Sequence, residues 1–504
     1  MPRQLWRRPA FWLGVILCAG AAYRLLFLLR PLDWVVSVCT ADDYYYYLST
    51  AWNVAHGHGS SADGGLTRHN GYQPLFLALL LPATALGATK TVLFWYGLAV
   101  QSISGLVAAW LSWRVTARLG NAWVALCPAV ALALNLYFVR ASLWGFETPL
   151  AIACTLAVVD ATLGRAPTWR VGLLAGLAVM ARVDVVLLAP ALALHLASAR
   201  RWRDLAVTAG VALLACLPWI LWSSAAFGSP LPQSGAAKIL AGNPAGFWNG
   251  FAAFCAQLPP LLVADRLAHL LPQQVAFTLG VLVLAASLSR PRHGGWIAWA
   301  ALALFATYAL LTDTSLAWQF TRYTAPAVAL LGIVLFSRPR PAGRWARASW
   351  AAPLLLALLA IGLDTGHVRW AMRTGPIPTY HGLCQREVPA ILSRIVGPGD
   401  LVGCFDSGSA GYFSNVPVVN LDGLVNAEIV NLLRDPDPAA GTWRERYLRY
   451  FEARGITILV GGTAYSWIRT IPEAAQWERL HASLQSSDGG EILIVRVPAR
   501  DGAP

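Results

Sequence analysis

Long apolar stretches separated by short, arginine-rich loops constrain this chain more than any other feature of its sequence. Of the 504 residues, 57% are hydrophobic and only 12% are charged, against roughly 25% charged residues in a soluble protein. A helix of roughly 20 apolar residues is long enough to cross a bilayer. The sequence therefore predicts an α-helical polytopic membrane protein with about eleven transmembrane helices. The stretches are residues 10–30, 92–113, 122–139, 149–164, 171–181, 185–199, 204–222, 273–289, 295–312, 323–336 and 349–363.

The arginines predict how these helices are oriented. If the N-terminal arginines are placed inside the cell, every arginine-rich short loop falls on that same side, as the positive-inside rule requires. These loops begin at Arg114, Arg165, Arg200, Arg290 and Arg338. Residues 74–88 are also apolar, but a crossing there would turn all later arginines outward, so we expect an interfacial helix on the outer face. The net charge of +13 thus reflects membrane orientation and does not indicate a nucleic-acid partner.

Two domains follow from this pattern. Residues 1–363 form the transmembrane domain, with a first outer loop at 31–91 and a second at 223–272 that could cover a substrate as a lid. Residues 364–504 are more charged and alternate strand-like with helical patterns, so we expect a soluble α/β domain outside the membrane. Its strands are predicted near 401–405, 416–421, 456–460 and 491–497, and its helices near 385–396, 443–454 and 473–485.

Two adjacent acids lie in the first outer loop, shortly after an apolar stretch. Asp42 and Asp43 follow Thr40 and precede four consecutive tyrosines. Carboxylates so close to lipid are costly unless they have partners or a function. Thr40 and Asp43 match a capping box that would open a helix ending near Ala55, but a cap explains one acid and not two. We therefore treat Asp42 and Asp43 as candidate catalytic acids.

Further candidates lie at the predicted outer ends of helices. Glu147 either caps a helix or faces the same cavity as the acid pair. Arg182, Lys238 and Arg322 lie at the depth where cationic groups would bind a lipid phosphate. Alternatively, Arg182 pairs with Asp184, Lys238 is solvated in its loop, and Arg322 contacts lipid headgroups. The first outer loop adds Tyr46, His58, Asn70, Tyr72 and Gln73 as candidate substrate-binding residues.

Two other patterns are weaker. His56, His58 and His69 surround a glycine-rich loop, but their spacing fits no tight metal-binding motif. Residues 408–411 follow a predicted strand without the glycine spacing of a dinucleotide-binding loop, so a turn is expected there.

These features together resemble the class C glycosyltransferases, which have the GT-C fold and include the protein O-mannosyltransferases and aminoarabinose transferases. The most specific part is the first outer loop, with the two acids and tyrosines at 42–47, Gly-His-Gly at 57–59 and Asn-Gly-Tyr at 70–72. Weaker similarities follow at 145–148, 181–184, 230–238, 322–326, 405–414 and 419–426. The resemblance spans nearly the whole chain.

The resemblance implies an activity. Family members transfer a sugar from a polyprenyl-phosphate donor to an acceptor hydroxyl or amine on the outer face of the membrane, with inversion at the anomeric carbon. Asp42 would be the catalytic base, and cations such as Lys238 and Arg322 would stabilise the departing phosphate. Asp43 or Glu147 could hold the acceptor, or with Asp42 a divalent cation such as Mg²⁺ or Mn²⁺, which some relatives need and others do not.

The resemblance also implies a location and partners. The protein would lie in the bacterial cytoplasmic membrane with its site facing the periplasm or exterior. It would bind a lipid-linked sugar, membrane lipid and an acceptor glycan, lipid or protein. Two alternatives stay open. A flippase of lipid-linked sugars would place ionisable residues deep within spans, where, apart from Asp160, the sequence has almost none. A non-catalytic binding component could share the fold.

Overall fold

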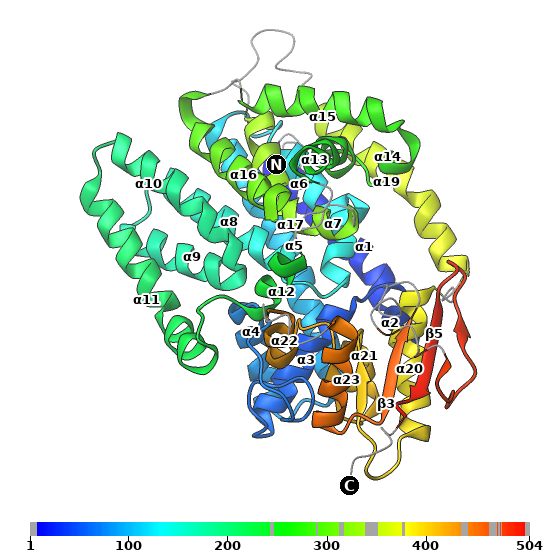
Figure 1. Ribbon diagram of the computed structural model, residues 1–504. Helices are drawn as coiled ribbons and strands as arrows, with labels where there is room; N and C mark the ends of the chain where they lie inside the picture. The colour runs from blue at the N-terminus through cyan, green and yellow to red at the C-terminus, as the bar shows by residue number, and fades with distance from the viewer. Residues whose placement is uncertain are drawn as a thin grey trace.

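Helices make up most of the computed structural model, which describes residues 8–241, 246–288, 291–311, 317–337, 351–374, 379–434, 442–462, 471, 474 and 476–498. A bundle of helices carries a small C-terminal domain with a β-sheet at one end (Figure 1). The architecture predicted from the apolar stretches, a helical bundle followed by an α/β domain, is therefore confirmed.

Each predicted apolar stretch coincides with helical structure. In the described part of the chain, three helices, α1, α5 and α11, are long and apolar enough to cross a membrane, or four if the bent pair α6 and α7 counts as one span. The number of crossings, about eleven, stays a prediction. The helices are α1 (Pro9–Leu28), α5 (Lys90–Leu119), α6 (Leu126–Leu134), α7 (Leu136–Leu143), α8 (Thr148–Leu163), α9 (Thr168–Ala181), the 3-10 helix η2 (Val183–Leu187), α10 (Leu188–Ser198), α11 (Trp202–Phe227), α15 (Gln273–Leu288), α16 (Pro291–Leu311), α17 (Ala317–Phe336) and α19 (Ala351–Thr374).

The C-terminal domain has three layers. Its sheet has the order β2-β1-β3-β5-β4, with β1 parallel to both β2 and β3 and with β5 antiparallel to its neighbours. Val388 and Leu392 of α20 pack on one face of the sheet, and Tyr447 and Phe451 of α23 pack on the other. The elements are α20 (Tyr380–Ile395), β1 (Val402–Cys404), α21 (Ser407–Ser414), β2 (Val418–Asn420), α22 (Ala427–Arg434), α23 (Trp443–Arg454), β3 (Ile458–Gly462), β4 (Leu484–Gln485) and β5 (Glu491–Arg496).

Two local predictions in this domain are wrong. The turn expected at 408–411 is part of the helix α21. The α-helix expected at 473–485 is not formed over its described residues, 474 and 476–485, where residues 474 and 476 have a 3-10 conformation and β4 lies at 484–485. The four predicted strands and the helices at 385–396 and 443–454 are confirmed. The errors fall where a short element is decided by its packing against other parts of the molecule.

Helix α5 shows that the two ends of the bundle differ. At its start, Lys90 donates a hydrogen bond to the carbonyl of Tyr412 in the C-terminal domain, over 2.8 Å. Near its other end, Arg114 and Arg118 form ion pairs with Asp160, at 3.0 and 2.8 Å. A helix of 30 residues spans roughly 45 Å. The arginines of this predicted inner loop and the domain predicted outside therefore lie at opposite ends of the bundle.

The predicted outer loops contain helices of their own. These are α2 (Leu32–Val38), α3 (Asp42–Ala55), α4 (Pro74–Ala85), α12 (Gln233–Ala241), α13 (Gly246–Leu262) and α14 (Leu267–Leu270). Helix α4 lies within the segment predicted to be interfacial. In the predicted lid, α13 packs inside the bundle against α15, α16 and α17 through Phe254, Cys255 and Leu258. The α13 part of the predicted lid is therefore not free to cover a substrate.

Two buried charges stabilise a break in the bundle. Helices α6 and α7 meet at an angle of 50°. The guanidinium of Arg24 in α1 donates to the carbonyl of Ala133, over 2.9 Å, and Asp364 in α19 accepts from the amide of Leu136, over 3.1 Å. Arg24 lies within the first predicted apolar stretch and is an exception to the near absence of ionisable residues there, whereas Asp364 lies directly after the last stretch. Because their partners are backbone groups that a broken helix leaves free, we interpret them as structural.

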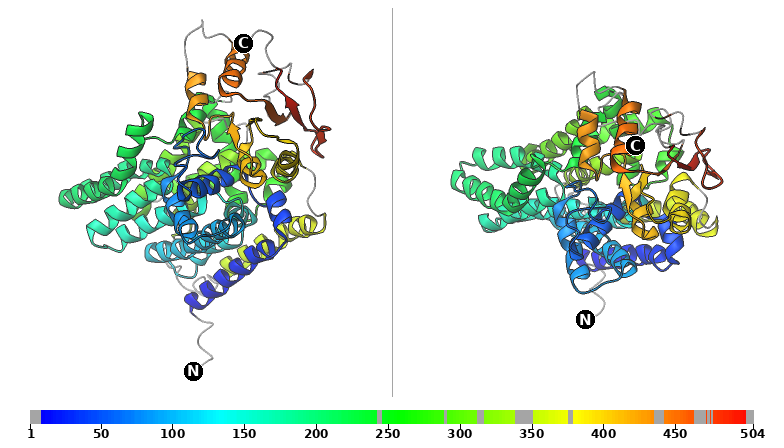
Figure 2. Two further views of the ribbon diagram at one scale, coloured as in Figure 1. Left: turned by 90° about the horizontal axis from the view of Figure 1, so that it is seen from below. Right: turned by 60° about the horizontal axis from the view of Figure 1, so that its bottom comes forward.

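The arrangement in space sets the C-terminal domain against the first outer loop. Helices α9, α10 and α11 project away from the rest of the bundle in all three views (Figures 1 and 2). The C-terminal domain lies on the other side, where α20 packs on α2 and α21 packs on α3. The acid pair at the start of α3 therefore lies between the bundle and the C-terminal domain.

Candidate active site

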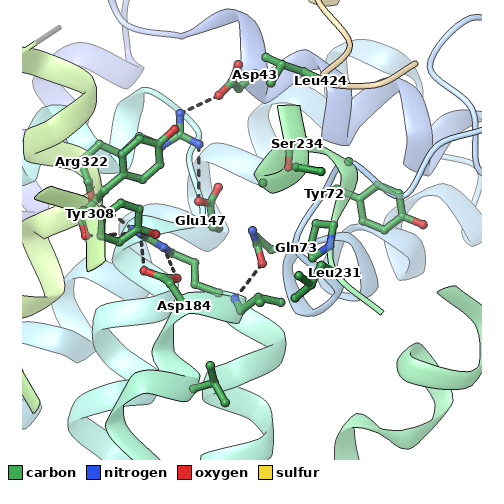
Figure 3. Close-up of a pocket in the computed structure, with 18 of the residues that line it drawn as sticks. Asp43, Tyr72, Gln73, Glu147, Asp184, Leu231, Ser234, Tyr308, Arg322 and Leu424 are labelled. Carbon is green, nitrogen blue, oxygen red and sulfur yellow. Dashed lines mark hydrogen bonds and ion pairs between the residues drawn. The ribbon is translucent and has the colours of Figure 1, made fainter. Parts of the chain in front are cut away.

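A cavity of about 290 Å³ lies where the predicted outer segments meet (Figure 3). Its walls come from α3, the loop before α4, the turn at η2, the start of α12, and helices α16 and α17. The C-terminal domain contributes one residue, Leu424. These segments are distant in sequence, and most of their cavity residues were assigned to one side of the membrane from the arginine pattern. The exceptions fall inside predicted apolar stretches and are Val186, Leu187, Thr307, Tyr308 and Tyr323.

Arg322 holds two acids together in the cavity wall. Its Nη1 donates to Oδ2 of Asp43 over 2.6 Å, and its Nη2 lies 3.5 Å from Oε1 of Glu147. The guanidinium also lies over the ring of Phe146, 3.6 Å from the ring centroid. The side chain of Asp43 is 26% exposed, whereas that of Glu147 is only 3% exposed. Asp43 is therefore the acid that can reach a bound molecule.

Glu147 is charged although it is buried. Burial alone would raise the pKa of its carboxyl group, but the guanidinium groups of Arg322 and Arg182 hold that pKa below its ordinary value. The hydroxyl of Tyr47 donates to Oε2 of Glu147 over 3.0 Å and accepts from the amide of Gln73 over 3.1 Å. Glu147 is thus fixed in place and keeps Arg322 at the cavity wall.

Arg182 is the second buried cation of the cavity. Its Nε and Nη2 donate to the two carboxylate oxygens of Asp184, over 3.1 and 2.8 Å. Nη2 also donates to the hydroxyl of Tyr308 over 2.9 Å, and the stacked rings of Tyr308 and Tyr323 lie beside the guanidinium. The alternative interpretation, an ion pair with Asp184, is confirmed, and this pair lies in the cavity wall.

Other predicted binding residues divide into two groups. Tyr46, Tyr72 and Gln73 line the cavity, and Oε1 of Gln73 accepts from the amide of Val183, which ties the first outer loop to the η2 turn. Asn70 is buried behind the cavity. Its side-chain amide donates to the Ser223 hydroxyl and the Leu231 carbonyl, and its oxygen accepts from the amide of Gln233. Asn70 therefore positions the start of α12.

Three predictions fall away from the cavity or outside the described residues. His58 is exposed in the loop after α3 and is not among the cavity residues. His69 is buried, which lowers the pKa of its imidazole to about 3, and its Nε2 lies 3.0 Å from the hydroxyl of Thr50. Lys238 belongs to α12, but its side chain lies outside the described residues.

Asp42, the expected base, faces the C-terminal domain instead of the cavity. Its Oδ2 accepts from the amide of Gly408 and its Oδ1 from the amide of Ser409, both over 3.0 Å. These amides belong to the first turn of α21, where a helix favours negative charge. Asp42 is only 8% exposed. Consecutive residues of an α-helix point about 100° apart, so α3 directs Asp42 and Asp43 to different places.

Helix α3 has the predicted bounds but not the predicted cap. It begins at Asp42 and ends at Ala55, and its N-cap residue is Ala41, with no side-chain capping bond. The hydroxyl of Thr40 bonds instead to the carbonyl of Val36 and the hydroxyl of Tyr45. All four tyrosines of the helix are buried. The helix is therefore enclosed between the bundle and the C-terminal domain, and its tyrosines do not lie at a headgroup interface.

The acids near this junction do not form a metal site. Arg322 lies between Asp43 and Glu147, and Asp42 faces away, so the three acids named as candidate ligands do not converge. Among the residues that the structure describes, no group of three His, Cys, Asp or Glu side chains is arranged to hold a metal ion. The donor set therefore does not fit a divalent cation in this arrangement.

Some cavity residues were not predicted. Tyr47 belongs to the run of tyrosines that marked α3, and Asp184 appeared only as a partner of Arg182. Tyr308 carried no signal in the sequence, and Leu424 was only part of a segment, 419–426, that resembles the family. Leu424 reaches the cavity only because α21 and the loop after β2 pack against the bundle.

Known proteins share this architecture. ArnT from Cupriavidus metallidurans in the apo state matches with a TM-score of 0.57 at 13% identity, over 94% of this chain and 98% of that protein. The same protein bound to undecaprenyl phosphate matches with a TM-score of 0.55 at 12% identity, over 95% and 97%. An oligosaccharyltransferase from Archaeoglobus fulgidus, tethered with an acceptor peptide, matches with a TM-score of 0.54 at 13% identity, over 98% of this chain and 75% of that protein.

These similarities establish the fold. Both proteins are glycosyltransferases with the GT-C fold, so the fold expected from the first outer loop is confirmed; at these identities the likeness extends to the fold alone. Residues 378–494 match a family described as "Domain of unknown function (DUF8728)". No curated protein matches the sequence.

Proposed function

We propose that this protein is an inverting glycosyltransferase that moves a sugar from a polyprenyl-phosphate carrier to an acceptor hydroxyl or amine. One observation carries the proposal: a single cavity in a GT-C fold joins the acid Asp43 to the buried cations Arg322 and Arg182 (Figure 3). The protein would act in the bacterial cytoplasmic membrane with this cavity facing the periplasm or exterior. ArnT, which shares the fold, binds undecaprenyl phosphate.

The two arginines suit the phosphate of the donor. A guanidinium offers planar paired donors that match phosphate oxygens, and in a site shielded from water such donors stabilise charge effectively. Arg182 is held by Asp184, whereas Arg322 is shared between Asp43 and Glu147. An incoming phosphate would compete with Asp43 for Arg322, which would free the Asp43 carboxylate for the acceptor. Lys238 on α12 stays a candidate third cation.

Asp43 would then act as the general base. The acceptor oxygen or nitrogen attacks the anomeric carbon from the face opposite the phosphate, and the bond between that carbon and the phosphate oxygen breaks. The acceptor proton passes to Asp43, and polyprenyl phosphate leaves with the bonding electrons. Because a phosphate is a good leaving group, one carboxylate is sufficient and no strong acid is needed. Attack from the opposite face inverts the configuration.

The proposal can be tested without knowing the acceptor. Purified protein in lipid would be incubated with a panel of radiolabelled polyprenyl-phosphate sugars and a cell-envelope extract as the acceptor source, and release of polyprenyl phosphate would be followed. We expect release from at least one donor by the wild type and a strong loss in Asp43→Asn. Asp33→Asn is a matched control, because Asp33 is an exposed acid of the same loop. Full release by Asp43→Asn would overturn the assignment of the base.

A further inference from the structure

The first turns of two helices meet at Asp42. Its carboxylate accepts from the amides of Gly408 and Ser409, as described above, and no room is left between the helices. A Cβ added to Gly408 would overlap the backbone oxygen of Asp42. The carboxylate therefore occupies the position beyond β1 where parallel sheets commonly bind a ligand next to a helix N-terminus. The transmembrane domain thus fills this position of the C-terminal domain with one of its own side chains.

The same contact continues to the cavity through Tyr46. The hydroxyl of Tyr46 donates to Asp42 and accepts from the side-chain amide of Asn420, over 3.2 Å, which also donates to the hydroxyl of Ser407. The body of Tyr46 lines the cavity. Asp42 is therefore connected to the cavity wall although it does not line it.

The loop after β2 closes the cavity on the side of the C-terminal domain. This loop, residues 420–426, brings Leu424 to the cavity. A Cβ on Gly71 would overlap the carbonyl oxygen of Leu424, so only glycine allows this approach. The side-chain amide of Gln233 donates to the carbonyl of Gly423 over 3.1 Å. The loop is thus held by the first outer loop and by α12 at the same time.

We propose that the C-terminal domain is part of the active site and that Asp42 and Gly71 are positioning residues, which dock this domain so that Leu424 forms the cavity wall near Asp43. Leu424 then helps to select the acceptor, because its side chain lies in the wall of the cavity that Asp43 also lines. The docking claim stands on geometry alone, whereas the claim about acceptor selection rests on the proposed function.

Hydrogen exchange of the full-length protein in lipid tests docking without any substrate. Asparagine keeps one acceptor oxygen but turns an NH₂ group toward a backbone amide, so Asp42→Asn should raise exchange at residues 407–414 and 420–426 about tenfold. Asp43→Asn is the matched control, one residue away, and should not lower the protection of either segment. Unchanged protection in Asp42→Asn, or equal loss in Asp43→Asn, would overturn the docking role.

A second variant keeps the test decisive if Asp42→Asn fails to fold. Gly71→Ala leaves Asp42 intact and displaces only the Leu424 carbonyl. It should therefore expose residues 420–426 to exchange while residues 407–414 stay protected. If both segments stay protected, Gly71 does not position the loop.

Kinetics then separate a functional role from a merely structural one. Leu424→Ala should raise the acceptor KM about tenfold with little change in kcat, because it removes an apolar wall and no reacting group. Binding of undecaprenyl phosphate, used as the donor probe, should not change, since Arg182 and Arg322 belong to the bundle. An unchanged acceptor KM would overturn the selection role. If no donor is turned over at all, the proposed function fails while the exchange result still decides docking.

Discussion

Arg322 supports one strong prediction because it is the shared partner of a buried acid, Glu147, and a partly exposed acid, Asp43. Replacing it with methionine keeps most of its volume and removes its charge. Glu147 is then left buried with its remaining bond to Tyr47 and with Arg182 as the remaining cation that lowers its pKa. Two unit charges 3.5 Å apart attract by about 5 kcal/mol at an effective dielectric constant near 20. Removing one partner of a buried pair costs about 3–5 kcal/mol of unfolding free energy.

The expected pH dependence follows from the sign of the Glu147 shift. Its pKa in the folded wild type is lowered, so its pairing stabilises the protein above the unfolded pKa of about 4.3, and this contribution is lost as the pH falls through the folded pKa. In Arg322→Met the dominant cause is burial, which raises the pKa. The variant should therefore lose stability as the pH rises from about 5 to about 8.

A double-mutant cycle measures the coupling directly. Denaturant titrations in lipid, followed by the intrinsic tryptophan fluorescence, would compare the wild type, Arg322→Met, Glu147→Gln and the double variant. We expect a coupling energy of about 2 kcal/mol or more, because Glu147→Gln removes the buried charge that Arg322→Met leaves without its partner. The same cycle with Asp43→Asn should give about 1 kcal/mol or less, because Asp43 is partly hydrated. Additive effects of Arg322→Met and Glu147→Gln would refute the argument.

Three further predictions concern other parts of the site. Arg182→Lys keeps the charge but loses the paired donors, so binding of undecaprenyl phosphate, measured by radioligand binding in lipid, should weaken about tenfold; unchanged binding would place the phosphate elsewhere. Burial of Asp422, together with the nearby charges of Asp43 and Asp42, raises its pKa to about 7. Ionising Asp422 in the folded protein therefore costs free energy, and this cost grows between about pH 4 and 7. Hydrogen exchange at 420–426, corrected for its intrinsic pH dependence, should therefore be slower at pH 6 than at pH 8, and Asp422→Asn should remove the difference. Asn70→Ala leaves the Gln233 amide without its partner and should cost about 1–3 kcal/mol in a denaturant titration, whereas the exposed control His58→Ala should cost less than about 0.5 kcal/mol; equal costs would contradict the role of Asn70.

The sequence predicted the fold well because membrane proteins carry strong one-dimensional signals. Apolar stretches marked the helical segments of the bundle except α13, which was assigned to an outer loop, and the arginines grouped the predicted outer segments that meet at the cavity. Five of the eight predicted binding residues line the cavity for this reason: Tyr46, Tyr72, Gln73, Arg182 and Arg322. The local sequence predicts whether a residue lies at the outer end of a helix, and these side chains all lie at or near such ends.

The direction in which a side chain points depends on packing against distant parts of the chain, and the wrong predictions for Asp42 and for the cap at Thr40 have this cause. Asp42 and Asp43 are adjacent in sequence, and only the rotation of α3 against α21 decides which of them faces the cavity. The capping box failed for a similar reason, because Thr40 finds partners in Val36 and Tyr45. The resemblance at 419–426 did not place Leu424 in the cavity, since docking of a separate domain brings it there.

The central claim is that Asp43, and not its neighbour, accepts the acceptor proton. Once a donor is identified, single-turnover release of polyprenyl phosphate should be measured in Asp43→Asn and Asp42→Asn side by side, with binding of undecaprenyl phosphate as the control for folding. The account predicts a loss of about 10²–10⁴-fold in Asp43→Asn, with the probe still bound, and a smaller loss in Asp42→Asn. The reverse order, with Asp43→Asn active and Asp42→Asn inactive but still binding the probe, would contradict it.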